Sequence, residues 1–129
     1  MKHSLHTLPL SNSFAKLPGT FYSRVQPTPF EQPAELIHFN TAAAELLDLD
    51  PAVACDPACA DIFSGRRPLP GAEPLAMLYA GHQFGHYVPQ LGDGRAIMLG
   101  ETTNRRQARW EIQLKGSGQT PYSRDGDGR

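Results

Sequence analysis

Two alternating segments in the last third of the chain constrain its fold most strongly. Residues 95–101 (RAIMLGE) and 109–116 (RWEIQLKG) carry apolar side chains at every second position, and the polar stretch TTNRRQ separates them. Alternation with a period of two is typical of half-buried strands, and a short polar connection joins antiparallel neighbours. The segments therefore predict a β-hairpin in which Lys115 points away from the apolar face of the second strand.

Weaker patterns predict the elements that precede this hairpin. Short runs of aromatic, β-branched or other apolar residues indicate two strands, at 20–26 and 34–39. Asn40 can cap a helix, and Gly65 can end one. The predicted helices span 41–49, 57–65 and 75–84. Helices together with an antiparallel hairpin place the chain in the α+β class.

Length and composition indicate one soluble domain, residues 1–129. The sequence is 40% hydrophobic and 19% charged, and it has neither a signal-like apolar stretch nor a run long enough to span a membrane. We expect a cytoplasmic protein that binds no membrane and no nucleic acid. Residues 95–129 hold 7 Lys and Arg against 4 Asp and Glu, although the net charge of the chain is -1. This basic tail favours an anionic ligand.

Two pairs of possible metal ligands have simpler readings. Cys55 and Cys59 would share a helix face, but no second Cys/His pair of zinc-site spacing accompanies them, which favours small, partly buried side chains. His82 and His86 have the spacing of zinc-binding helices, yet Gln83 replaces the glutamate of H-E-x-x-H. We expect a packed helix end at this point and no metal.

A glycine turn before the hairpin and a lysine at its end suggest phosphate binding. Protein kinases cover ATP phosphates with a glycine loop and neutralise them with a strand lysine, and here GDGR at 92–95 and Lys115 hold those places. An ordinary hairpin turn and a solvated lysine fit the same spacing. Neither G-x-G-x-x-G nor G-x-x-x-x-G-K-[ST] is present, so no Rossmann or P-loop site is indicated.

Longer strings are more specific than this spacing. Residues 79–101 (YAGHQFGHYVPQLGDGRAIMLGE) and 110–129 (WEIQLKGSGQTPYSRDGDGR) closely resemble the SelO family of protein adenylyltransferases, also called YdiU. The upstream FYSRVQPTPF and FNTAAAELLDLD are similar to the same family. Members are several times longer, and the sequence stops inside the loop that begins GDGR. We therefore expect an amino-terminal fragment, truncated before the catalytic half.

The resemblance implies a fold, an activity and a site. The fold would be an incomplete protein-kinase-like one, its amino-terminal lobe with an antiparallel β-hairpin and flanking helices. The whole protein would bind ATP in a reversed orientation and transfer AMP to Ser, Thr or Tyr hydroxyls of protein substrates. The ATP contacts of the family fall on six residues: Gly92, Gly94, Arg95, Lys115, Asp127 and Gly128.

The resemblance also implies what the chain lacks. The catalytic base and the Asp/Asn pair that holds Mg²⁺ (or Mn²⁺) lie downstream in the family, so no catalytic residue and no metal ligand is expected here, and the chain alone should be inactive. Two alternatives stay open: a non-catalytic module that binds a nucleotide or a protein, and a kinase-type phosphotransferase. A downstream magnesium set would favour the enzyme.

The tail 116–129 raises three smaller questions. Its hydroxyl residues, Ser117, Thr120, Tyr122 and Ser123, are either self-modification sites or ordinary turn residues, and turn residues are the simpler reading. Asp125 adds a negative charge where the family more often has a neutral or basic residue. DGDGR resembles the start of a calcium loop, but Arg129 stands at the fifth position, which argues against calcium.

Overall fold

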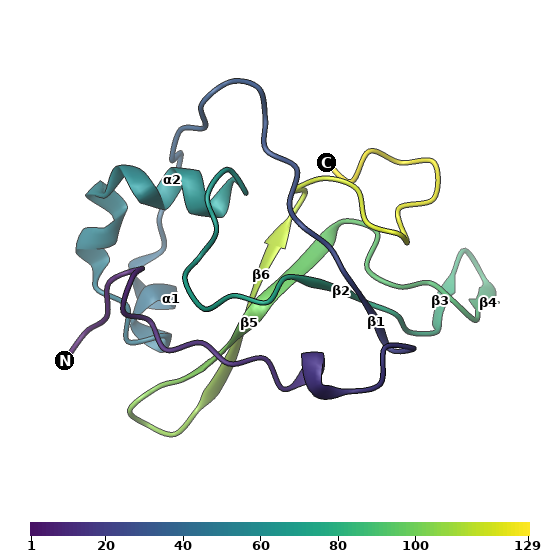
Figure 1. Ribbon diagram of the computed structural model, residues 1–129, viewed down its shortest axis with the longest axis horizontal. Coiled ribbons are helices and arrows are strands. Elements are labelled where there is room, and N and C mark those ends of the chain that lie inside the picture. The colour runs from purple at the N-terminus through teal and green to yellow at the C-terminus, as the bar shows by residue number, and fades with distance from the viewer.

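The computed structural model describes all 129 residues and contains a four-stranded antiparallel sheet in the order β1-β2-β5-β6 (Figure 1). Its strands are β1 (Tyr22–Arg24), β2 (Leu75–Met77), β5 (Ala96–Thr103) and β6 (Arg109–Lys115). The helices are α1 (Thr41–Leu46) and α2 (Pro57–Phe63), with 3-10 turns η1 (Phe14–Lys16) and η2 (Pro51–Cys55). The predicted α+β class is confirmed, and the kinase-like lobe stays a prediction. None of the helices has the length and apolar character needed to cross a membrane.

The predicted hairpin is confirmed as β5 and β6. Ile97 pairs with Leu114 and Gly100 with Ile112, and a register shift between Met98 and Gly100 leaves Leu99 outside the pairing. Bulges of this kind bend a strand and increase its twist. Thr102 and Thr103, expected in the turn, extend β5, so that residues 104–108 alone connect the strands.

The core lies on one face of the sheet. Apolar side chains of β5 and β6 meet those of α1, η2, α2 and the amino-terminal segment in a single cluster: Leu5, Leu8, Ala44, Leu49, Val53, Ala58, Cys59, Ile62, Leu69, Ile97, Leu99, Ile112 and Leu114. Figure 1 shows both helices gathered at one side of the sheet. The alternate residues of β6, which include Lys115, are exposed, as the sequence pattern predicts. Trp110 lies nearer the turn and stays 38% exposed.

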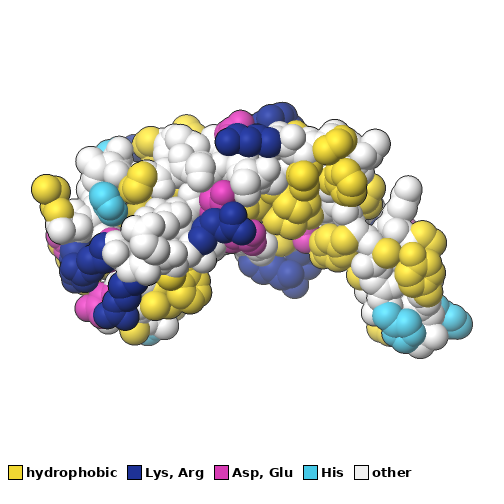
Figure 2. All heavy atoms as spheres, turned by 90° about the horizontal axis from the view of Figure 1, so that it is seen from below, with side chains coloured by type: hydrophobic (Ala, Val, Ile, Leu, Met, Phe, Trp, Pro, Cys, Tyr) yellow, Lys and Arg dark blue, Asp and Glu magenta, His cyan; other side chains and the backbone are white.

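The helix predicted over 75–84 is wrong. Leu75 and Ala76 are both fully buried in β2, and since successive side chains of a strand point to opposite faces, both faces of β2 are covered. The strand pairs with β1 along one edge and with β5 along the other. The segment continues into a separate hairpin of β3 (Gly81–Gln83) and β4 (His86–Val88). Phe84 and Gly85 both have positive φ at its turn, a conformation that an α-helix does not contain. Figure 2 shows this β3–β4 hairpin projecting from the body, with histidine and apolar side chains on its surface.

The strand predicted over 34–39 is also wrong. No residue of this stretch pairs with a strand, and Ile37 is 89% exposed. A strand is stable only with a hydrogen-bonded neighbour, and these residues have none in the four-stranded sheet. The helix caps are confirmed, since the Asn40 side chain accepts from the Ala43 N–H at the start of α1, and Gly65 with φ 82° follows α2.

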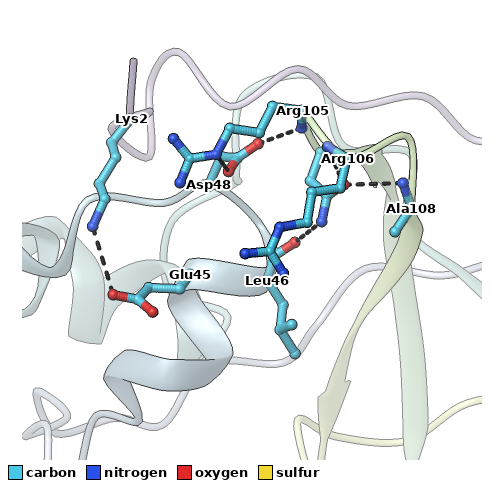
Figure 3. A network of polar contacts seen from close by, with 8 residues as sticks. Lys2, Glu45, Leu46, Asp48, Arg105, Arg106 and Ala108 are labelled. Carbon is cyan, nitrogen blue, oxygen red and sulfur yellow. Dashed lines mark hydrogen bonds and ion pairs between the residues drawn. The ribbon is translucent and has the colours of Figure 1, made fainter.

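A polar network fixes the turn of the β5–β6 hairpin to the end of α1 (Figure 3). Both Asp48 carboxylate oxygens bind Arg105, one through its backbone N–H at 2.6 Å and the other through Nε at 3.1 Å. Asn104 donates to the Leu46 carbonyl at 2.8 Å. The hairpin is thus held at its turn as well as through the core.

Candidate functional site

An open cavity of about 490 Å³ lies at the end of the β5–β6 hairpin opposite its turn. Its walls come from the glycine turn before β5, the last residue of β6, the loop that follows β6 and the β3–β4 hairpin. All six residues predicted to bind ATP line it, together with ten others. The lining comprises Tyr79, Gln83, Leu91, Gly92, Asp93, Gly94, Arg95, Ala96, Lys115, Tyr122, Ser123, Arg124, Gly126, Asp127, Gly128 and Arg129.

The hairpin brings Arg95 and Lys115 together. Ala96 pairs with Lys115, and the Gly116 N–H donates to the Arg95 carbonyl at 2.8 Å, so the start of one strand lies beside the end of the other. Both charged side chains are exposed. Twenty residues apart in sequence, they become neighbours because the strands run antiparallel.

The glycine turn at 92–94 is held by the side chain of Asp93, which is buried. One carboxylate oxygen accepts from the Met77 N–H at 3.0 Å and the other from the Tyr79 hydroxyl at 2.8 Å. Gly92 has φ 62°, and a Cβ added to it would lie 2.6 Å from Cγ of Tyr122. Glycine is therefore required at this position by both backbone conformation and packing.

Hydroxyl groups join the loop after β6 to the glycine turn. Thr120 Oγ1 donates to the Asp93 carbonyl, and Ser123 Oγ donates to the Gly94 carbonyl at 2.6 Å. The Tyr122 and Ser23 hydroxyls lie within hydrogen-bond distance of each other, at 2.9 Å. These contacts give three of the four hydroxyl residues of the tail a structural role, in line with the reading of them as turn residues.

The second glycine loop closes the cavity through Asp127 and Gly128. Asp127 Oδ1 accepts from the Arg129 N–H at 2.9 Å, and the carboxylate makes no ion pair with Arg95 or Lys115. Gly128 is buried with φ 75°, and a Cβ added to it would collide with the backbone of Gly118. Only glycine fits there without displacing the loop.

Positive charge in the cavity is not neutralised by the protein. Four cationic side chains line it, and none has a carboxylate within ion-pair distance: Arg95, Lys115, Arg124 and Arg129. The Arg129 guanidinium lies 4.1 Å from the centre of the Phe30 ring, and its buried Nη1 has no hydrogen-bond partner. Buried donors are almost always satisfied, so an anionic acceptor at this position would complete the site.

The Tyr79 hydroxyl has a raised pKa. Partial burial, the hydrogen bond to Asp93 and the negative charge of that carboxylate, in this order of importance, together raise it to about 12. The phenol therefore stays neutral at physiological pH and remains a donor to Asp93. The pair positions the turn and carries no catalytic proton in this arrangement.

Neither pair of possible metal ligands forms a site. No group of three or more His, Cys, Asp or Glu side chains is placed to hold a metal ion. Cys55 is exposed and Cys59 buried, and both are free thiols. His82 and His86 lie exposed on the β3–β4 hairpin and not at a packed helix end, so the structural role expected of them is wrong as well.

Sequence patterns missed several residues of the cavity. Arg124 and Arg129 were passed over because isolated arginines in a loop carry no spacing signal, and Tyr79 because it was placed in a helix. Asp93 stood inside the GDGR turn as an unassigned residue. The burial of its carboxylate and the two donors that bind it become visible only in three dimensions.

Comparison with known proteins gives the family to which this chain is similar. The family model described as protein adenylyltransferase SelO matches residues 4–129. Relatives named protein nucleotidyltransferase YdiU are 56% identical over 126 residues in Thiobacillus denitrificans and 52% over 126 in Myxococcus xanthus, and each alignment covers 98% of this chain. A relative of the same name in Methylorubrum populi is 58% identical over 121 residues, or 94% of the chain.

These relatives are much longer than the chain. The matched segment makes up 26% of the Thiobacillus and Myxococcus proteins and 24% of the Methylorubrum protein. The chain thus spans about a quarter of their length, and its cavity lies within the part they share. On the extent of the family match and the identity of its relatives, the chain belongs to the SelO family.

Proposed function

We propose that the cavity binds the phosphate chain of ATP and that the whole protein transfers AMP to Ser, Thr or Tyr hydroxyls of protein substrates. The observation that carries this proposal is the convergence of two glycine loops and four unpaired cations on one cavity. The nucleotidyltransferase names of the relatives support a nucleotide as the ligand.

The six residues would act as a phosphate clamp. Arg95 and Lys115 supply positive charge to the phosphate oxygens, and charge-assisted contacts of this kind are stronger than neutral ones. Gly92 and Gly94 have no side chain where Tyr122 approaches, so the glycine turn and the loop after β6 can lie close together around the phosphates. Gly128 lets the second loop close, and Asp127 is exposed enough to accept from a nucleotide NH or hydroxyl.

The transfer itself requires groups that this cavity does not supply. The substrate hydroxyl oxygen would bond to the α-phosphorus as the bond from that phosphorus to the bridging oxygen breaks, with pyrophosphate leaving and the hydroxyl proton passing to a base. The chain would bind and orient the phosphates and stabilise the negative charge that develops on them. No residue of the cavity is assigned as the base.

A magnesium or manganese ion would supply further charge neutralisation in such a transfer. The carboxylates of this chain do not fit such an ion. Asp93 is buried, with both oxygens bound to protein donors, and Asp127 belongs to no group of three or more possible metal ligands. No step is therefore assigned to a metal held by these residues.

Two experiments test the proposal. Equilibrium dialysis of the chain with ATP measures binding, and failure to bind ATP would refute the phosphate clamp. In the second, this chain replaces the matching segment of the Thiobacillus relative, and the chimaera is incubated with ATP labelled on its α- or its γ-phosphate. Label from the α-phosphate on protein supports adenylyl transfer. Label from the γ-phosphate alone would instead indicate a kinase, and label from neither a binding module.

A further inference from the structure

Arg124 has an unusual backbone conformation for its residue type. It lies in the loop after β6, lines the cavity, and has φ 56°. Positive φ is uncommon outside glycine and concentrates at sites where the surrounding structure holds a residue in a functional position. Phe84 and Gln107 have the same conformation in hairpin turns, but Arg124 is the one residue of this kind that also lines the cavity with a charged side chain.

The Arg124 side chain is held by a neutral partner. Its Nη1 donates to Gln83 Oε1 at 3.1 Å, which joins the loop to β3 of the β3–β4 hairpin. A carboxylate at this point would fix the guanidinium and also neutralise it. An amide oxygen fixes it and leaves its charge available to a ligand.

Nearby acids do not neutralise Arg124. Asp125 adjoins it in sequence and Asp127 lies three residues on, yet neither forms an ion pair with it. The guanidinium retains further N–H donors beyond the one given to Gln83. Arg124 thus combines unused donors, an uncompensated charge and a fixed position in the wall of the cavity.

We propose that Arg124 is a further phosphate-binding residue of the cavity and that Gln83 is the residue that positions it. The inference rests on the proposed binding of ATP and extends it. Arg95 and Lys115 belong to the strand ends, whereas Arg124 reaches the cavity from the loop, so a phosphate chain would be contacted from two structural elements. A longer chain meets more of these cations, and the site therefore selects nucleoside polyphosphates over monophosphates.

The test compares ATP and AMP binding by wild type and Arg124→Ala. Loss of a hydrogen bond between charged groups is expected to weaken ATP binding about 10- to 100-fold. AMP binding should change much less, and the selectivity for ATP should fall. Arg106→Ala is the matched control, because Arg106 lies at the far end of the hairpin, forms no ion pair and should leave both affinities unchanged.

A double-mutant cycle tests the positioning role of Gln83. Gln83→Met keeps the length of the side chain, removes the acceptor and changes no charge. It should weaken ATP binding in the wild-type background and have no effect in the Arg124→Ala background. Fluorescence of Trp110, the only tryptophan, reports whether each variant is folded. A residue that merely braces the hairpin would alter the unfolding midpoint and leave ATP affinity unchanged in both backgrounds.

The outcomes separate the two proposals. If wild type binds ATP and a folded Arg124→Ala binds it equally well, the role of Arg124 is refuted while the phosphate clamp stands. If Gln83→Met weakens binding equally in both backgrounds, Gln83 does not act through Arg124. If wild type binds no nucleotide, the proposed function fails and this inference fails with it.

Discussion

Asp93 shows how a single side chain can set the geometry of a site without facing its ligand. Its carboxylate accepts from the Met77 N–H and the Tyr79 hydroxyl, and its carbonyl accepts from Thr120. The glycine turn is thereby fixed to the end of β2 and to the loop after β6. Gly92, Gly94 and Arg95, which are expected to contact phosphate, are thus held in place by Asp93, which is not.

Lys115→Ala should separate a phosphate-clamping lysine from a solvated one. Removing a charge beside the reacting phosphorus typically costs about 2.7 to 4 kcal/mol, or roughly 100- to 1000-fold in rate. AMP transfer by the chimaera is the measurement, with unfolding midpoints recorded for each variant. Lys16→Ala is the matched control, because Lys16 is exposed and does not line the cavity. Equal activity of wild type and a folded Lys115→Ala would refute the clamp.

The Tyr79 hydroxyl should titrate well above the ordinary range of a tyrosine. Its pKa is raised from 10.0 to about 12, so its contribution to stability is fully present below pH 10 and is lost as the pH rises towards 12. Phenolate absorbance after a rapid pH jump should show one late group, which Tyr79→Phe removes. Asp93→Asn should lower the midpoint only in part, since burial is the larger cause. Absence of a late-titrating group that Tyr79→Phe removes would contradict this assignment.

For single residues, the resemblance of long segments to the SelO family predicted more cavity residues than the spacing of glycines and lysine did. The six expected ATP contacts line one cavity because the antiparallel hairpin brings 92–95 beside 115. Arg124 and Gln83 could not be paired in advance, because 41 residues separate them and the contact depends on a hairpin that was predicted as a helix. Side-chain contacts across such distances follow from the fold and not from local pattern.

Elements were predictable where a local signal agreed with the tertiary environment. In β6 the buried Ile112 and Leu114 alternate with exposed residues over the core, so pattern and burial coincide. The prediction of a helix from Leu75 was wrong because a central strand is buried on both faces, so its sequence lacks the alternation of apolar and polar residues that marks a strand. The strand predicted over 34–39 was wrong for a different reason, because its apolar residues have no neighbouring strand with which to pair.

Asp48→Ala tests the contact between the hairpin turn and α1. Asp48 is 5% exposed and has φ 54°, and its loss would leave the Arg105 N–H without its acceptor. Leaving such a donor unpaired costs about 1–3 kcal/mol of unfolding free energy. Asp48→Asn should cost less, because asparagine keeps an acceptor and tolerates this conformation. Urea unfolding measures both, and equal loss in the two variants would argue against the acceptor role.

The whole molecule is a binding surface without a complete reaction centre. Its cavity holds cations and glycine loops, and no cluster of metal-ligating side chains accompanies them. Around the cavity, the β3–β4 hairpin exposes Phe84 at 89% and Tyr87 at 70%. Under the proposed function, the chain would contribute scaffold and charge to the binding of the phosphates.

The 129-residue chain should therefore bind ATP and transfer none of it. Incubated with α-labelled ATP and a generic protein substrate, it should leave protein unlabelled, because its cavity has no base placed beside the phosphates and no metal cluster. The chimaera run in parallel serves as the positive control. Label on the substrate or on the chain itself would show that these residues suffice for catalysis.

The position of the cavity at the open mouth of the β5–β6 hairpin couples ligand binding to strand fraying. Strand ends open more readily than strand centres, and here the network around Asp48 secures only the opposite end. A ligand bound by both Arg95 and Lys115 would link the start of β5 to the end of β6. At one hundred times its dissociation constant it would stabilise the folded state by about 2.7 kcal/mol. Amide protons near the mouth would then exchange more slowly with solvent, and the nucleotide would complete the folding of its own site.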